Sequence, residues 1–233
     1  MDFKINNKIS ALIITFNEEI HMKELLNSLN FVDEIVVVDS FSSDNTKFIC
    51  EGFTNVKFIQ NRFENFTSQR NFAITHAKND WILFLDADER LSPELKNEIV
   101  KTLNNNNNKH SAFLFLRTFM FKNKVLHFSG WQTDKIFRLF NKNLANYTTE
   151  RLVHEKLEVD GPVGILKNKL IHYSYTDFKS YKSKMINYGK LKAQEKFNKK
   201  YKPNFVIKKF HPIYNFLYNY IIRLGFIDGK KGI

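Results

Sequence analysis

Four short apolar runs near the start of the chain constrain its fold more than any other feature of the sequence. Each run is rich in β-branched or aromatic residues and is apolar on both faces; the runs are 9–15, 34–39, 56–59 and 81–86. Strands with two apolar faces must be covered on both sides, as they are in a parallel sheet. Helical patterns separate the runs, at 18–30, 43–52 and 68–78. This alternation predicts an α/β fold with a mostly parallel central sheet.

The sequence from residue 92 onwards adds a helix and then more strands. Ser92 is a favourable N-cap and Pro93 suits the first helical position, which predicts a helix over 92–103. The runs 112–121 and 135–142 predict strands that complete the sheet and line a second pocket. In the first helical segment, the apolar stripe expected to face the sheet is Ile20, Leu25, Leu26 and Leu29.

The net charge of +12 is concentrated in the last third of the chain. Residues 1–159 contain 20 Lys and Arg and 20 Asp and Glu, whereas residues 160–233 contain 16 and 4. A neutral body followed by a basic segment favours chemistry in the first part and attachment to an anionic partner in the second.

These changes in pattern predict how the chain divides. A catalytic domain is expected over 1–175, divided into halves at 1–110 and 111–175. A basic helical extension is expected over 176–233, because a lysine-rich helical pattern there is followed by one with an apolar, aromatic stripe. That stripe can pack on the catalytic domain or lie in a membrane interface.

Cysteine content and the N-terminus favour a reducing, cytoplasmic location. Cys50 is the single cysteine of the sequence, so an internal disulfide framework is excluded. The N-terminus lacks the apolar core of a secretory signal. The apolar stretches are too short or too often interrupted by charge to span a bilayer, which needs about 20 apolar residues.

Polar residues gather where the predicted strands end. In a parallel α/β sheet, ligands bind in the crevice beyond the carboxyl ends of the strands. Residues at or just after these ends are therefore candidate ligand contacts. They are Thr15, Asn17, Glu18, Asp39, Asp86 and Asp88.

The last two of these residues form a D-x-D pair. In an extended chain, residues two apart point to the same side, so Asp86 and Asp88 can present oxygens to one point. Two such anions repel each other unless a cation lies between them, and a hard divalent ion such as Mn²⁺ or Mg²⁺, shared with a diphosphate, fits them. The alternative is a pair of solvated turn residues ahead of a capped helix.

The segments that contain these residues resemble a known family. LIITFNEE (12–19), EIVVVDSFSSDNT (34–46), SQRNFA (68–73) and WILFLDADERLSPEL (81–95) are similar to the donor half of family 2 glycosyltransferases, whose fold is GT-A. The later segments resemble a narrower subgroup, the lipopolysaccharide-core glucosyltransferases that modify inner-core heptose. They are GWQTDKIFRLFNK, ERLVHEKLEV, LIHYSYTDFKSYKSK and YIIRLGFIDGKKG.

The resemblance implies roles for the donor residues. Asp39 matches the position that accepts a hydrogen bond from uracil, while Thr15, Asn17 and Glu18 match the loop that contacts the nucleoside. Three further residues match positions near the ribose and the metal. Arg70 matches a position near the base and ribose, and its alternative is a surface ion pair. Asp86 is expected to face the ribose and the metal, and Asp88 is expected to hold Mn²⁺ or Mg²⁺ on the diphosphate.

Inverting transfer in this family needs a base for the acceptor hydroxyl. The match to the family's VHE segment favours Glu155, with Glu150 and Asp134 as alternatives. His154 is either a contact to metal or phosphate or a hydrogen-bonded structural histidine, and His172 leaves the same two interpretations open.

Two further residues are expected to shape the acceptor pocket. Trp131 can stack on a sugar, and Arg138 can hold a phosphate. The alternatives are core packing for Trp131 and an ion pair for Arg138.

These features predict an inverting, metal-dependent hexosyltransferase that uses a UDP-sugar, with UDP-glucose favoured. Its expected acceptor is a lipopolysaccharide inner-core or related glycan, and its expected location is the cytoplasm, with peripheral attachment to the cytoplasmic face of the inner membrane. Exopolysaccharide, capsule and protein acceptors are alternatives. A nucleic-acid partner is not expected, because no nucleic-acid module is recognisable.

Two rival functions fit this sequence less well. A sugar nucleotidyltransferase would carry a glycine-rich basic loop after the first strand, where this chain has TFNEEIHMK. A non-catalytic membrane- or glycan-binding protein would have no need of Asp39, Asp86, Asp88 and Glu155, all of which are present.

Overall fold

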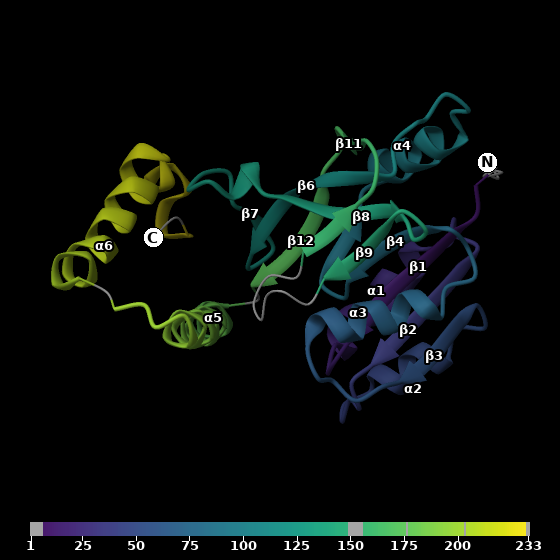
Figure 1. The fold of residues 1–233 in the computed structure, drawn as a ribbon, viewed down its shortest axis with the longest axis horizontal. Coiled ribbons are helices and arrows are strands. Elements are labelled where there is room, and N and C mark those ends of the chain that lie inside the picture. Colours follow the sequence, from purple (N-terminus) through teal and green to yellow (C-terminus); the bar gives the residue numbers. More distant parts are fainter. Residues whose placement is uncertain (1–6, 149–155, 176, 203, 232–233) are drawn as a thin grey trace. The chain divides into compact units, whose positions relative to one another are not determined.

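The structure is a computed structural model that describes residues 7–148, 156–175, 177–202 and 204–231. Its first half contains a parallel sheet in the order β3-β2-β1-β4. Figure 1 shows these strands side by side. Their bounds agree with the predicted apolar runs and are β1 Ile9–Thr15, β2 Glu34–Asp39, β3 Val56–Gln60 and β4 Trp81–Asp86.

Both faces of this sheet are buried, and alternate residues of β1 show how. Ile9, Ala11 and Ile13 belong to a core that includes side chains of α1 (Glu19–Ser28) and α4 (Pro93–Asn104). Leu12 belongs to a second core that includes Ala73 of α3. Helices therefore cover the two faces, which is why the strands are apolar on both sides. The other helices of this half are α2 (Thr46–Glu51) and α3 (Phe66–Thr75).

The stripe predicted for the first helix is wrong at one position. Leu25, Leu26 and Leu29 are buried, but Ile20 is 77% exposed, and Met22 is buried on the core side in its place. The helix begins at Glu19, so Ile20 lies in its first turn on the solvent side. Helix α4 agrees with prediction, because the Ser92 side chain accepts a hydrogen bond from the amide of Leu95 at 3.2 Å and caps the helix.

Beyond β4 the sheet continues with antiparallel neighbours. In the order β4-β8-β6-β12-β5, strand β8 is antiparallel to both β4 and β6. A separate two-stranded sheet pairs β9 with β10. The bounds are β5 Glu89–Leu91, β6 Ala112–Phe121, β7 Lys124–Val125, β8 Lys135–Asn141, β9 Ala145–Thr148, β10 Lys156–Val159, β11 Val163–Ile165 and β12 Leu170–Tyr175.

The chain divides into two compact units. Unit 1 comprises residues 1–116 and 135–171, and unit 2 comprises residues 117–134 and 172–233. Residues 117–134 thus belong to the same unit as the C-terminal segment. Unit 2 contains the helical elements η1 Trp131–Thr133, α5 Phe178–Asn198, α6 Phe205–Leu217, a π-helical turn η2 Tyr218–Ile222 and a 3₁₀ element η3 Gly225–Lys231. Among the described residues, no helix combines the length and apolar character that crossing a membrane requires.

Candidate active site

Strand register brings the predicted donor residues of unit 1 to one edge of the sheet. Thr15 of β1 is paired with Asp39 of β2, and Ile14 of β1 is paired with Asp86 of β4. Because the strands are parallel, their carboxyl ends coincide. Thr15, Asp39 and Asp86 are therefore neighbours at the edge where ligands bind in such sheets.

Asp39 is completely buried at this edge. Its Oδ2 atom accepts hydrogen bonds from the Ser42 amide at 2.9 Å and from Gln60 Nε2 at 3.1 Å. Its Oδ1 atom accepts from the Ser42 hydroxyl. A carboxylate offers about four acceptor positions, so capacity for a further donor remains. Gln60 and Ser42 position the Asp39 carboxylate, and the sequence analysis named neither.

The loops that follow β1 and β2 are tied to each other. Asn17 Oδ1 accepts from the Ser43 amide at 2.8 Å, and the Asn17 amide donates to Ser42 Oγ at 2.8 Å. Asn17 and Phe41 both have positive φ values, 55° and 62°. A bulky side chain is rare in this region of conformational space, and such strain concentrates at ligand sites. The Glu18 amide donates to Thr46 Oγ1 at 2.9 Å.

Thr15 has a buried polar atom that calls for a partner. Its side chain is 4% exposed, and its Oγ1 atom has no hydrogen-bond partner among the described residues. Buried hydroxyls are nearly always hydrogen-bonded, so each exception needs an explanation. The position of Thr15 at the strand ends offers one, namely a ligand atom.

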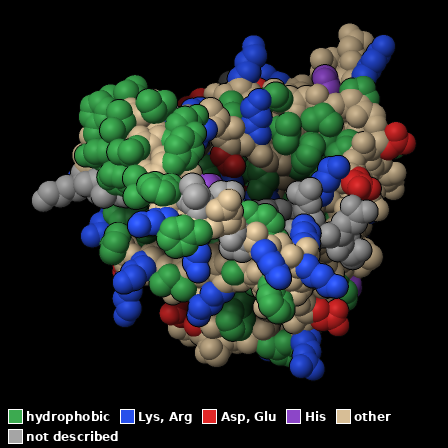
Figure 2. Space-filling model, turned by 60° about the vertical axis from the view of Figure 1, so that its left-hand side comes forward, with side chains coloured by type: hydrophobic (Ala, Val, Ile, Leu, Met, Phe, Trp, Pro, Cys, Tyr) green, Lys and Arg blue, Asp and Glu red, His purple; other side chains and the backbone are tan. Residues whose placement is uncertain are grey.

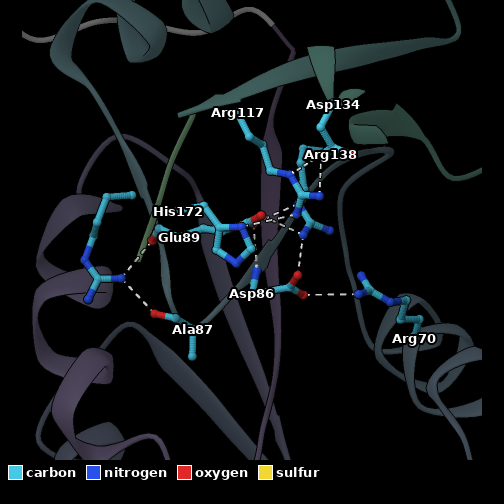
Figure 3. Close-up of polar contacts among 9 residues, drawn as sticks. Arg70, Asp86, Ala87, Glu89, Arg117, Asp134, Arg138 and His172 are labelled. Atoms are coloured by element: carbon cyan, nitrogen blue, oxygen red, sulfur yellow. Dashed lines mark hydrogen bonds and ion pairs between the residues drawn. The ribbon is translucent and has the colours of Figure 1, made fainter. Parts of the chain in front are cut away.

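Asp86 lies between two arginines (Figure 3). Its Oδ1 atom is 3.1 Å from Arg70 Nη2, and its Oδ2 atom is paired with Arg138. Arg138 also donates to Glu89 Oε1 at 2.8 Å, and both Arg138 and Glu89 are completely buried or nearly so. Burial by itself would lower the pKa of Arg138, but the charges of Asp86 and Glu89 raise it above its usual value. Two cations and two anions thus balance in the interior of unit 1.

Arg138 and Arg70 have partners that the sequence did not specify. For Arg138, the ion-pair interpretation describes the observed contacts, and the predicted phosphate contact stays a prediction. For Arg70, the ion-pair alternative describes the contact with Asp86, but Arg70 is not at the surface, because its side chain is 7% exposed. Its predicted position near the base and ribose stays a prediction. Its guanidinium lies over the Phe84 ring, 4.6 Å from the ring centroid, which holds it beside Asp86.

The D-x-D pair is not extended throughout. Strand β4 ends at Asp86, and residues 87–88 form a turn before β5. Glu89 closes this turn, because its Oε2 atom accepts a hydrogen bond from the Asp86 amide at 3.1 Å. Asp88 is consequently a half-buried turn residue, and the expectation that the chain stays extended through it is corrected. Glu89 was missed, although an acid directly after the D-x-D pair was a visible signal.

A second polar cluster belongs to unit 2 and centres on Arg117, which the sequence analysis did not name. Arg117 Nε donates to Asp134 Oδ2 at 2.6 Å, and Arg117 Nη1 is 3.4 Å from His172 Nδ1. Phe119 packs against Trp131 and His172, with ring centroids 4.9 and 5.1 Å apart. Asp134, Trp131 and His172, which were predicted separately, are therefore brought together by one arginine and one phenylalanine.

The remaining predicted residues, Glu150, His154 and Glu155, lie outside the described residues. Among the residues that are described, no three His, Cys, Asp or Glu side chains are placed to hold a metal ion. Oxygen ligands are nevertheless of the type that Mn²⁺ and Mg²⁺ prefer, and the turn places the Asp88 carboxyl just beyond the end of β4. The donor type thus fits a divalent ion, and the role of Asp88 as a metal ligand stays a prediction.

Comparison with known proteins identifies the family. The model of the family described as glycosyl transferase family 2 matches residues 10–157, which include the strand-end residues described above. The chain belongs to glycosyl transferase family 2. The family resemblance, the GT-A fold class and the assignment as a glycosyltransferase enzyme are thereby confirmed.

Relatives within the family extend over most of the chain. An uncharacterized glycosyltransferase of Rickettsia bellii is 32% identical over 238 residues, which cover 98% of this chain and 81% of that protein. The lipopolysaccharide core biosynthesis glycosyltransferase LpsC of Rhizobium meliloti is 25% identical over 231 residues, covering 95% of this chain and 82% of LpsC. Among solved structures, S. aureus TarS is 29% identical with a TM-score of 0.41, covering 50% of this chain and 37% of TarS.

Proposed function

We propose that this glycosyltransferase transfers a hexose, with glucose favoured, from a UDP-sugar to a glycan acceptor and inverts the anomeric centre. The observation that carries the proposal is the convergence of Thr15, Asp39 and Asp86 at the carboxyl edge of β1, β2 and β4. A buried carboxylate with a free acceptor position, a buried hydroxyl that has no partner among the described residues and a carboxylate between two arginines form a polar cluster suited to a nucleoside diphosphate.

The donor base and ribose are assigned to the residues that the two loops position. Asp39 accepts a hydrogen bond from the uracil N–H, and Thr15 Oγ1 gains the partner that it lacks. Asn17 and Glu18 border the nucleoside through the loop tied to Ser42 and Ser43. Arg70 keeps Asp86 oriented toward the ribose.

Asp88 is the proposed ligand of Mn²⁺ or Mg²⁺. Asp86 has two cationic partners, and Asp88 lies in the turn directly beyond it, at the edge where the carboxyl ends of the parallel strands meet. His154 is a further candidate ligand. A divalent ion held there would neutralise charge on the departing diphosphate.

Transfer itself needs one base. Glu155 takes the proton of the acceptor hydroxyl while the oxygen–carbon bond to the sugar forms and the bond to the diphosphate breaks. Glu150 is the alternative in the same segment. Asp134 is less suited to this role because Arg117 already engages its carboxylate.

The acceptor is proposed to be a lipopolysaccharide inner-core or related glycan. The name of the relative LpsC and its coverage of most of this chain support this choice. Trp131 and His172, grouped around Arg117 in unit 2, supply an aromatic surface and cationic contacts that suit a phosphorylated saccharide.

Nucleotide binding tests the proposal. Calorimetry with UDP, GDP, ADP and dTDP, each with and without Mn²⁺, should show UDP selectivity and tighter binding with the metal. Asp88→Asn should remove the metal dependence, whereas Asp160→Asn, which alters an exposed carboxylate after β10, should keep it. Absence of nucleotide binding in every metal condition would contradict the proposed donor site.

A further inference from the structure

One side of helix α6 and the π-helical turn η2 is apolar and uncovered. We call this side the α6 apolar face; it consists of Phe210, Ile213, Tyr214, Leu217 and Ile221. These residues recur at spacings of three and four, so they lie on one side of the helix. Phe210 is 56% exposed, Leu217 is 45% exposed and Ile221 is 51% exposed.

The opposite side of the same segment is polar and internally hydrogen-bonded. Lys208, His211, Asn215 and Asn219 follow the same helical spacing. Asn215 Nδ2 lies 2.9 Å from His211 Nδ1, and Asn219 Nδ2 donates to the Asn215 carbonyl at 2.9 Å. The segment is therefore amphipathic: the side chains of its polar stripe are hydrogen-bonded within the helix, and its apolar side chains are exposed to solvent.

The charge around this face indicates the occupant. Residues 172–233 contain 14 Lys and Arg and 3 Asp and Glu. One of the acids, Asp228, is used inside unit 2, where it accepts backbone hydrogen bonds. Figure 2, in which the side of Figure 1 that carries α5 and α6 comes forward, shows exposed hydrophobic side chains gathered together with Lys and Arg side chains beside them.

We propose that the α6 apolar face inserts into the interface of an anionic lipid bilayer. Soluble proteins rarely expose contiguous apolar patches beyond a few hundred square ångströms, so such a face marks an interaction surface. An amphipathic segment with aromatic and aliphatic residues on one side and lysines nearby is the composition of interfacial helices. Lysines close to an anionic surface are attracted to it, so this surface matches anionic lipid.

Contacts within unit 2 link this face to the loop that carries Trp131. The Asp228 carboxylate is buried and accepts hydrogen bonds from the amides of His127 at 3.0 Å and Phe128 at 2.9 Å. The Ser129 amide donates to the Arg223 carbonyl at 2.9 Å. Gly130, at φ 85°, packs so closely on Arg223 that a Cβ atom there would overlap its guanidinium.

The loop from His127 to Trp131 is consequently fastened to the chain directly after η2. A bilayer that holds the α6 apolar face therefore also holds this loop near its surface. Binding of the α6 apolar face to the bilayer would therefore also bring Trp131 close to a saccharide linked to a lipid of that bilayer. This inference does not depend on which nucleotide the donor site binds.

Vesicle co-sedimentation of the full chain tests the inference. Binding is compared on vesicles of phosphatidylcholine alone and of phosphatidylcholine mixed with phosphatidylglycerol. The wild type should bind the mixed vesicles, and added salt should weaken binding because the lysines contribute. Ile213→Glu and Leu217→Glu should each reduce the affinity by about tenfold or more, since they place a charge in the buried face.

Asn215→Glu is the matched control, because it introduces the same charge on the polar stripe of the same helix. It should reduce the affinity by at most about fivefold, the electrostatic share of one charge at the surface. The thermal unfolding temperature of all three variants should equal that of the wild type, which would show that reduced vesicle binding does not result from unfolding.

Three outcomes would overturn the proposal. The first is that the wild type does not bind anionic vesicles. The second is that all three glutamate variants lose binding equally, which would show that the attraction is electrostatic and involves no insertion. In the third outcome, light scattering shows a wild-type dimer that Leu217→Glu separates while vesicles are not bound, which would assign the face to a second copy of the chain.

Discussion

The two units of the molecule handle charge and apolar surface in opposite ways. Unit 1 contains 19 Lys and Arg and 20 Asp and Glu, a formal net charge of −1, whereas unit 2 contains 17 and 4, a net charge of +13. In unit 1 the apolar strands are covered on both faces, and the arginines beside the site are buried against carboxylates. In unit 2 a helix leaves its apolar side in contact with solvent.

This difference separates two kinds of binding. A balanced, buried polar cluster fixes a few side chains precisely, which suits recognition of one nucleotide. An excess of positive charge beside an apolar helix is less specific and suits a membrane surface. The comparison predicts that changes in one unit leave the function of the other intact, and the following variants test it from the largest expected effect to the smallest.

The largest effect is expected from Arg138→Met in unit 1. It leaves the buried carboxylate of Glu89 and that of Asp86 without their shared cation, so the free energy of unfolding should fall by about 3–5 kcal/mol. Denaturant unfolding measures the change. Arg117→Met in unit 2 is the counterpart. Because its partner Asp134 is 41% exposed, this change should lower the free energy of unfolding by no more than about 1 kcal/mol. Equal losses would remove the contrast between the two clusters.

Asp88→Asn should weaken catalysis strongly without weakening the fold. A lost electrostatic contact at the reacting diphosphate lowers kcat/KM by about 10²–10³-fold. Sugar release from UDP-glucose, followed with and without an acceptor, measures the effect, and Asp160→Asn serves as the control for removal of a carboxylate. A variant that keeps wild-type kcat/KM at saturating Mn²⁺ would argue that Asp88 is only a turn residue.

The thiol of Cys50 reports on the interior of unit 1. Burial, assisted by the negative charges of Asp39 and Glu51, raises the pKa of this thiol from 9.0 to about 12. The unfolded chain therefore ionises first, so the contribution of this thiol to the free energy of unfolding should be constant below pH 9 and fall as the pH rises from 9 toward 12. Unfolding measured across this range should lose this part of its pH dependence in Cys50→Ser. Fast reaction of the folded protein with a thiol reagent at pH 8 would contradict a buried, protonated Cys50.

The smallest effect is expected from Ser92→Ala. This change removes the cap of α4, whose residues pack in unit 1, and should cost about 1 kcal/mol of unfolding free energy. Ser92→Asp should preserve the cap. Vesicle binding should be the same in both variants, and a parallel loss of vesicle binding would show that the two units depend on each other.

Sequence reasoning located the strands of unit 1 well, for a physical reason. β1, β2 and β4 begin and end where the apolar runs do, because a strand covered on both faces must be apolar at every position. The same reasoning failed at Ile20, which lies in the first turn of the helix on the solvent side. The buried residues Met22, Leu25, Leu26 and Leu29 have the spacing i, i+3, i+4 and i+7 of one helix face, and Ile20 falls outside that face.

The composition of the polar clusters could be predicted less well. Asp86 was expected at the site, but its partner Arg138 is distant in sequence, and nothing local to either residue encodes the pair. The turn at 87–88 depends on the Glu89 carboxylate, which accepts a hydrogen bond from the Asp86 amide, and strand periodicity does not detect this bond. The association of 117–134 with the C-terminal segment likewise rests on contacts such as that of Asp228 with His127.

The separation of donor binding from membrane docking is the central claim, and one paired measurement tests it most directly. UDP affinity and anionic-vesicle affinity are both measured for Asp86→Asn, at the strand edge of unit 1, and for Leu217→Glu, on the α6 apolar face. We predict that Asp86→Asn loses UDP binding and keeps vesicle binding, and that Leu217→Glu shows the reverse. Loss of both activities in either variant, or of neither in both, would contradict the account.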